Sequence, residues 1–191
     1  LVSVAAGITT AFFEARLPAG SPVIRVMPNT PALVGAGVSA LAAGRFATAA
    51  QIAAAAELFT GVGLTLTVPE SQIDAVTAVS GSGPAYFFLF VEALVDAGVA
   101  AGLTRSVATD LAMQTMAGSA AMLLDRRGAG RDGSAARPDT TAAELRALVT
   151  SPGGTTAAGL RELERGGLRA AVAAAVDAAK TRSEQLGITT E

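Results

Sequence analysis

Hydrophobic and polar positions follow two different patterns along the chain. From residue 1 to 69, short apolar runs alternate with stretches of helical spacing, which is typical of βαβ units. After Glu70, apolar residues recur at spacings of three and four in alanine-rich segments almost to the end. The pattern predicts an α/β domain over 1–69 and an all-helical domain over 70–191, with Pro69 marking the boundary.

The first part is predicted to hold a largely parallel sheet with helices between its strands. The expected strands are 1–6, 22–28, 38–44 and 64–68, and the expected helices are 7–16 and 48–63. In the second part the expected helices are 71–79, 84–101, 105–124, 140–149, 155–165 and 168–186. The segment 125–139 combines glycines with mixed charges and lacks apolar periodicity, which predicts a surface loop.

Composition and charge limit the kinds of partner that the chain is expected to bind. Of its 191 residues, 51% are hydrophobic and 16% charged, so we expect part of the surface to meet another subunit. The formal net charge is −2 and the chain carries no long basic run, so nucleic acid is not expected as a partner. The uncharged run 75–91 is shorter than the roughly 20 residues of a membrane span and contains Pro84. A buried helix is therefore expected there, and no membrane.

Missing residue types exclude several chemistries. The chain has no Cys, His or Trp. A Ser-His-Asp triad, a Cys nucleophile and a His or Cys zinc site are thus excluded within it, and no metal site is expected. The absence of Cys suits a reducing compartment, and the apolar start lacks the basic region of a secretory signal. We expect a cytoplasmic setting.

The segment LVTSPGGTTAAGL at 148–160 is the most informative candidate site, because it joins two predicted helices through a glycine pair. Glycines let the backbone approach a ligand, and the following helix presents free N–H groups at its positive end. This arrangement predicts a site for a small carboxylate, although the same residues also suit a simple helix cap. The polar and glycine positions of this corner are Ser151, Gly153, Gly154, Thr155 and Thr156.

A second glycine-containing segment, AVSGSGPAYFF at 78–88, leads into a helix that starts at Pro84. It is not a P-loop because no Lys follows the glycines, so close helix packing through glycine is the favoured interpretation. Glu70 lies just before the first helix of this part, where a carboxylate favours a helix N-terminus.

A third candidate, VMPNTP at 26–31, lies at the end of a predicted strand. Open α/β sheets bind ligands beyond the carboxyl ends of their strands, which places Asn29 and Thr30 where a cofactor would lie. The small side chains of Ala5 and Ala6, at the end of the first strand, would let a flat ring pass. A plain turn and a buried alanine pair are the alternatives.

Together, three segments resemble the pyrroline-5-carboxylate reductase family in order and spacing, over residues 1–186. They are VMPNTP at 26–31, AVTAVSGSGPAYFF at 75–88 and VTSPGGTTAAGLRELERGGLRAAV at 149–172. The resemblance implies the C-terminal part of a Rossmann dinucleotide-binding domain, followed by an all-helical dimerisation domain like that of 6-phosphogluconate dehydrogenase. It also implies reduction of 1-pyrroline-5-carboxylate to L-proline by hydride from NADPH or NADH, the last step of proline biosynthesis.

The resemblance also implies roles for individual residues. Thr156 would be the catalytic residue, with its hydroxyl facing the ring nitrogen, which must gain a proton to accept hydride well. The implied substrate contacts are Ser151, Gly153, Gly154, Thr155, Thr156 and Glu70. The implied cofactor contacts are Val4, Ala5, Ala6, Met27, Pro28, Asn29 and Thr30.

The chain departs from the family pattern at several points. No predicted strand is followed by the GxGxxG turn that binds the pyrophosphate, which predicts that the first part of the Rossmann domain is missing and puts the nucleotide affinity in question. The loop 125–139 looks longer than in relatives. Leu148 and Ala142 stand where relatives often have a polar residue and a proline, so no contacts are carried over from that helix.

Members of the family dimerise through their helical domains, so the resemblance implies a homodimer, with a decamer left open. Two other functions also stay open. A 3-hydroxyacid-dehydrogenase-like enzyme would need a Lys or His in the helical domain, and the only Lys is Lys180, near the end. A catalytically incomplete chain that serves as a helical dimerisation module is the second alternative.

Overall fold

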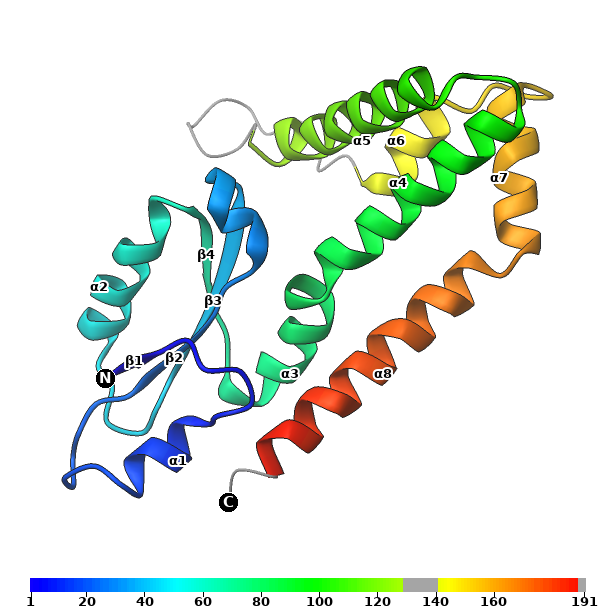
Figure 1. Ribbon diagram of the computed structural model, residues 1–191. Coiled ribbons are helices and arrows are strands. Elements are labelled where there is room, and N and C mark those ends of the chain that lie inside the picture. The colour runs from blue at the N-terminus through cyan, green and yellow to red at the C-terminus, as the bar shows by residue number, and fades with distance from the viewer. Residues whose placement is uncertain (129–140, 189–191) are drawn as a thin grey trace. The chain divides into compact units, whose positions relative to one another are not determined.

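The computed structural model describes residues 1–128 and 141–188 (Figure 1). Its contacts divide the chain into two compact units. The α/β unit consists of Leu1–Tyr86 together with Ala171–Glu191, and the helical unit consists of Phe87–Ala170. The last helix of the chain thus starts in the helical unit and ends in the α/β unit. The predicted boundary at 69/70 stays a prediction.

Four strands form one sheet in the α/β unit, in the order β1-β2-β3-β4. They are β1 (Val2–Ser3), β2 (Ile24–Met27), β3 (Gly37–Ala43) and β4 (Gly63–Thr67). The pairs β1–β2 and β3–β4 are parallel, whereas β2–β3 is antiparallel. Two of the three pairs are parallel, as expected of a largely parallel sheet. The central pair departs from this pattern because only a short 3₁₀ helix (η1, Thr30–Val34) joins its strands and a parallel crossover needs a longer connection.

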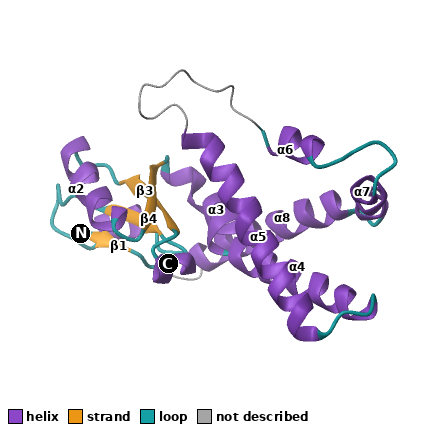
Figure 2. Ribbon diagram, turned by 90° about the horizontal axis from the view of Figure 1, so that it is seen from above, coloured by secondary structure: helices purple, strands orange, loops and turns teal. Residues whose placement is uncertain are grey.

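After Pro69 the described residues contain helices and connections but no strand (Figure 2). The helices of the chain are α1 (Thr10–Glu14), α2 (Ala49–Thr60), α3 (Ile73–Val76), α4 (Gly83–Ala100), α5 (Arg105–Gly128), α6 (Ala142–Leu148), α7 (Thr155–Arg165) and α8 (Leu168–Ile188). A 3₁₀ turn (η2, Glu70–Gln72) precedes α3, and a π-helical turn (η3, Thr77–Gly81) follows it.

Several predicted boundaries are wrong, among them the strand expected over 1–6, which is only Val2–Ser3, and the helix expected over 48–63, which ends at Thr60. The helix expected over 7–16 begins only at Thr10, because Gly7 adopts a φ of +75° and Thr9 caps the helix by accepting from the amide of Phe12. The loop expected to start at residue 125 is helical as far as Gly128, and its remainder lies outside the described residues.

Both faces of the sheet are covered by helices, which places the core of the α/β unit on two sides of the strands. One cluster consists of Ile24, Val26, Leu41 and Ala55, and brings α2 onto one face. The other consists of Ala40, Ala42 and Ile73, and brings α3 onto the opposite face. The alternation along the strands, with side chains pointing to opposite faces in turn, produces this two-sided packing.

The core of the helical unit is thin. Val95 of α4 packs against Ala108 and Ala112 of α5, and a Cβ on Gly98 would lie 3.1 Å from the Cβ of Ala108. Much of α4 stays exposed, with Phe88 67% accessible. Among the described residues one helical stretch, Glu70–Ala100, is long and apolar enough to cross a membrane by length and composition alone, which is weak evidence for a span.

Candidate functional site

The corner before α7 has the backbone geometry that its sequence predicts. Gly153 adopts a φ of +70°, a left-handed conformation that favours glycine. Gly154 is the N-cap residue of α7, and its amide donates to the Ser151 carbonyl oxygen at 3.1 Å. A Cβ on Gly154 would lie 2.6 Å from Ser151 Oγ, which could rotate away, so the conformation of Gly153 is the feature of this turn that favours glycine.

The first turn of α7 points unused backbone donors at an open surface. The amides of Thr155 and Thr156 belong to this turn, where a helix offers no intrahelical acceptor, and the glycine cap supplies no side-chain acceptor. The turn also lacks an acidic residue, so no side chain of its own offsets the positive end of the helix. Ser151, Gly153, Thr155 and Thr156 are exposed. Such a corner suits a small carboxylate.

Charged side chains link α7 to the segments on either side of it. Arg146 Nη1, on α6, lies 3.8 Å from Glu164 Oε1. Arg169 Nη2 forms an ion pair with the same oxygen at 2.8 Å. The hydrogen bond from Arg169 lowers the pKa of Glu164, and the same contact raises the pKa of Arg169. These pairs are exposed and surround the helix end opposite the corner.

Asn29 joins two of the sequence motifs within the α/β unit. Its Nδ2 donates to the Ser80 carbonyl oxygen at 3.1 Å, and its Oδ1 accepts from the Val38 amide at 2.9 Å. A Cβ on Gly81 would lie 2.9 Å from Met27 Cε, so this glycine serves close packing, as the sequence favours. The side-chain amide of Asn29 is therefore occupied inside the protein, and its contact with a cofactor stays a prediction.

The loop after β1 lies at the same edge of the sheet as the loop after β2. The two strands are parallel, with Ser3 opposite Arg25, so Val4–Ala6, directly after β1, and Met27–Thr30, which begins with the last residue of β2, both lie at the carboxyl ends of neighbouring strands. Val4, Ala5 and Ala6 are exposed, and the alternative of a buried alanine pair is wrong. The predicted cofactor residues are thus brought together at one edge, which is where open α/β sheets bind ligands.

Glu70 has internal partners in the structure. Its Oε1 accepts from Arg25 Nη1 at 3.0 Å and from the Thr10 amide at 3.2 Å. The Arg25 side chain is only 4% exposed. Glu70 Oε2 is buried, with no hydrogen-bond partner among the described residues. The carboxylate links β2, the start of α1 and η2, and its substrate contact stays a prediction. Arg25 could have been noticed as the one charge within an apolar strand.

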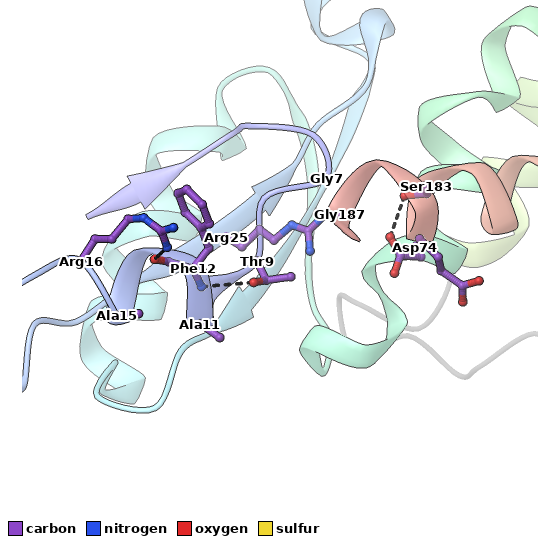
Figure 3. Close-up of a pocket in the computed structure, with 11 residues that line it drawn as sticks. Gly7, Thr9, Ala11, Phe12, Ala15, Arg16, Arg25, Asp74, Ser183 and Gly187 are labelled. Atoms are coloured by element: carbon purple, nitrogen blue, oxygen red, sulfur yellow. Dashed lines mark hydrogen bonds between the residues drawn. The ribbon is translucent and has the colours of Figure 1, made fainter. Parts of the chain in front are cut away.

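A pocket of about 420 Å³ lies in the α/β unit, and sequence reasoning did not find it (Figure 3). It is lined by Gly7, Thr9, Ala11, Phe12, Ala15, Arg16, Arg25, Asp74, Ser183, Glu184 and Gly187. Its charged side chains have protein partners: Arg25 donates to Glu70, Asp74 accepts from Ser183, and Glu184 accepts from Lys180. Arg16 donates to the Phe12 carbonyl oxygen at 3.0 Å. The hydrogen bond to Glu184 raises the pKa of Lys180. Among the described residues no three potential metal ligands gather.

The fold and the site define a class of protein in which part of a Rossmann-type α/β domain continues into an all-helical domain. A family model described as pyrroline-5-carboxylate reductase dimerisation matches residues 70–186. The chain is 69% identical to the pyrroline-5-carboxylate reductase of Mycobacterium tuberculosis over its whole length, which is 66% of that relative. The chain therefore belongs to the pyrroline-5-carboxylate reductase family, and it spans about two-thirds of the length of this relative.

Solved structures of the family share the fold. The pyrroline-5-carboxylate reductase of Coxiella burnetii has a TM-score of 0.86 and 39% identity, and the match covers 97% of this chain and 64% of that one. The pyrroline carboxylate reductase of Plasmodium falciparum, solved with NADP bound, has a TM-score of 0.81 and 33% identity, covering 98% of this chain and 71% of that one.

Proposed function

We propose that the protein reduces 1-pyrroline-5-carboxylate to L-proline with NADPH or NADH. The observation that carries the proposal is the corner at Ser151–Thr156, whose exposed backbone donors suit the carboxylate of this substrate, in a chain that belongs to the reductase family. In this interpretation the amides of Thr155 and Thr156 hold the carboxylate at the positive end of α7.

The hydroxyl of Thr156 would orient the ring nitrogen and hold a proton beside it. Reduction of the imine needs a hydride at carbon and a proton at nitrogen, and a chain without His or Cys has few local donors. When bound, the nicotinamide supplies the hydride. The Ser151 carbonyl oxygen accepts a hydrogen bond from the Gly154 amide, which closes the turn. Ser151 is exposed, so its hydroxyl would be free to lie beside the substrate carboxylate.

The strand edge of the α/β unit fits the nicotinamide end of such a cofactor. The small, exposed side chains of Ala5 and Ala6 allow a flat ring to approach, and the backbone of Met27–Thr30 follows the neighbouring strand at the same edge. None of the four strands β1–β4 is followed by a GxGxxG turn for the pyrophosphate, and the letters GAGRDG at 128–133 begin at the end of helix α5, so these residues would hold only part of a dinucleotide.

The helical part would form a homodimer, with a decamer as a higher assembly. Its thin core leaves large apolar side chains uncovered, and surfaces of this kind mark protein interfaces. Side chains of α4 and the α6–α7 region that are more than half exposed include Phe87, Phe88, Leu89, Leu148 and Val149. Burial of α4 in a dimer would also account for its hydropathy without a membrane, and we place the protein in the cytoplasm.

The test is calorimetric binding of L-proline to the chain and to Thr156→Val. We expect specific binding by the parent and about a tenfold loss or more in the variant, because a hydrogen bond between ligand and site is removed. Thr115→Val, an exposed threonine of α5, is the matched control and should bind as the parent does.

Activity is tested with a chimera in which the chain is joined to the portion of the Mycobacterium tuberculosis relative that it does not cover. Loss of NADPH absorbance with pyrroline-5-carboxylate in the chimera, and its sharp reduction by Thr156→Val, would support the proposal. A folded, dimeric chimera that binds neither proline nor dinucleotide would overturn it and favour the dimerisation module.

A further inference from the structure

The end of the last helix is seated against the loop that follows β1. We propose that the C-terminal end of α8 is a positioning element for the loop Val4–Gly7, which carries the predicted cofactor contacts Val4, Ala5 and Ala6, and that Ser183 is the residue that fixes α8 there. The proposal rests on the proposed function, because it concerns how the dinucleotide edge of the sheet is held in place.

Ser183 joins α8 to helix α3 through a hydrogen bond to Asp74. Its Oγ donates to Asp74 Oδ1 at 2.6 Å, and the residue is only 5% exposed (Figure 3). Hydrogen bonds to charged groups are stronger than neutral ones and are costly to leave unmade when buried. This contact fixes one turn of α8 against α3, within the same compact unit.

A second contact, one turn further along α8, reaches the loop directly. A Cβ on Gly7 would lie 3.3 Å from the carbonyl carbon of Leu186, and a Cβ on Gly187 would lie 3.1 Å from the Gly7 carbonyl oxygen. Gly7 also has a φ of +75°, a conformation that favours glycine, and its closeness to α8 leaves little room for a Cβ. The backbones of the loop and the helix end therefore touch.

Among the residues that the structure describes, few other contacts hold the loop. β1 is only two residues long, and Val4, Ala5 and Ala6 are all exposed. Within the loop, the Ala5 amide donates to Ser3 Oγ at 3.3 Å, and the next anchor is the Thr10 amide on Glu70. Exposed backbone with few packed neighbours opens at low free energy. Within the described part of the chain, the contact at Gly7 is thus a tertiary support of the loop between these two hydrogen bonds.

The test is hydrogen exchange of the Val4–Thr9 amides in the chain itself. Ser183→Ala removes the anchor, and Gly187→Ala presses on the Gly7 carbonyl oxygen although it improves helix propensity. We expect exchange in the loop to accelerate by about tenfold or more in both variants, while amides of β3 change little. Asp74→Asn, which keeps an acceptor oxygen, should retain most of the protection.

Matched controls come from α5, where Ser119 bonds its own helix and a Cβ on Gly118 would meet no atom within 4 Å. Ser119→Ala and Gly118→Ala should leave loop exchange unchanged. Unchanged loop exchange in Ser183→Ala and Gly187→Ala would overturn the proposal.

The second readout is the affinity of the chimera for NADPH, which is measured by fluorescence titration. We expect the dissociation constant to rise about tenfold in Ser183→Ala without a matching loss of turnover at saturating NADPH. Faster loop exchange with unchanged NADPH affinity would also overturn the positioning role. Absence of NADPH binding in the parent chimera, with the exchange response intact, would instead show that the proposed function is wrong.

Discussion

Replacement of Glu70 by alanine tests the buried ion pair that joins three segments of the α/β unit. The change removes the acceptor of Arg25 Nη1 and of the Thr10 amide. Breaking a fully buried pair costs about 3–5 kcal/mol, because one charge stays buried without a partner. Arg25 is 4% exposed but Glu70 is 28% exposed, so we expect a smaller loss of about 2–3 kcal/mol in the free energy of unfolding.

Urea denaturation followed by far-ultraviolet circular dichroism measures this loss, at one fixed protein concentration because the chain is proposed to dimerise. Glu162→Ala is the control, since it breaks the exposed pair with Arg165 and should change stability little. In an Arg25→Met background, Glu70→Ala should cost much less, because the buried charge is gone. Equal effects of Glu70→Ala in both backgrounds would refute the reasoning.

Two further predictions concern the sheet and the surface of α7. Gly63→Ala should lower the free energy of unfolding, measured by urea denaturation, by about 3 kcal/mol or more. Gly63 has a φ of +146°, and a Cβ there would overlap the Gly37 carbonyl oxygen. Gly61→Ala is the control and should be tolerated, because a Cβ on Gly61 would meet no atom within 4 Å. Arg169 lowers the pKa of Glu164, so their pair stabilises the folded state at pH values above the ordinary carboxyl pKa. This stabilisation disappears as the pH falls through the lowered pKa of Glu164. Carbon NMR titration should show the pKa of Glu164 rising in Arg169→Gln; an unchanged pKa would contradict this cause.

The bounds of several helices could be predicted from short stretches of sequence. Helix α7 has the predicted bounds, Thr155–Arg165, because a glycine pair before it and a glycine after it mark both ends. The capping box of Thr48 and Gln51 marks the start of α2 in the same way. Backbone donors at the corner before α7 follow from the same local signals, so the candidate carboxylate site was predictable.

Strand pairing was less predictable. The alternation of apolar runs located the strands, but whether neighbours run parallel depends on how the connecting segment packs. The short η1 segment between β2 and β3 forces an antiparallel pair, although the overall pattern is that of βαβ units. The clustering of Val4–Ala6 with Met27–Thr30 could be predicted, because β1 and β2 are parallel neighbours.

By itself the sequence determined the elements, the corner before α7 and the family resemblance, because each depends on residues close together in the chain. Only the tertiary structure decided which distant side chains meet. Ser183 and Asp74 are 109 positions apart, and Asn29 and Ser80 are 51 apart. Such contacts leave no periodic signal, since they form only when whole elements pack and bring their polar groups into register.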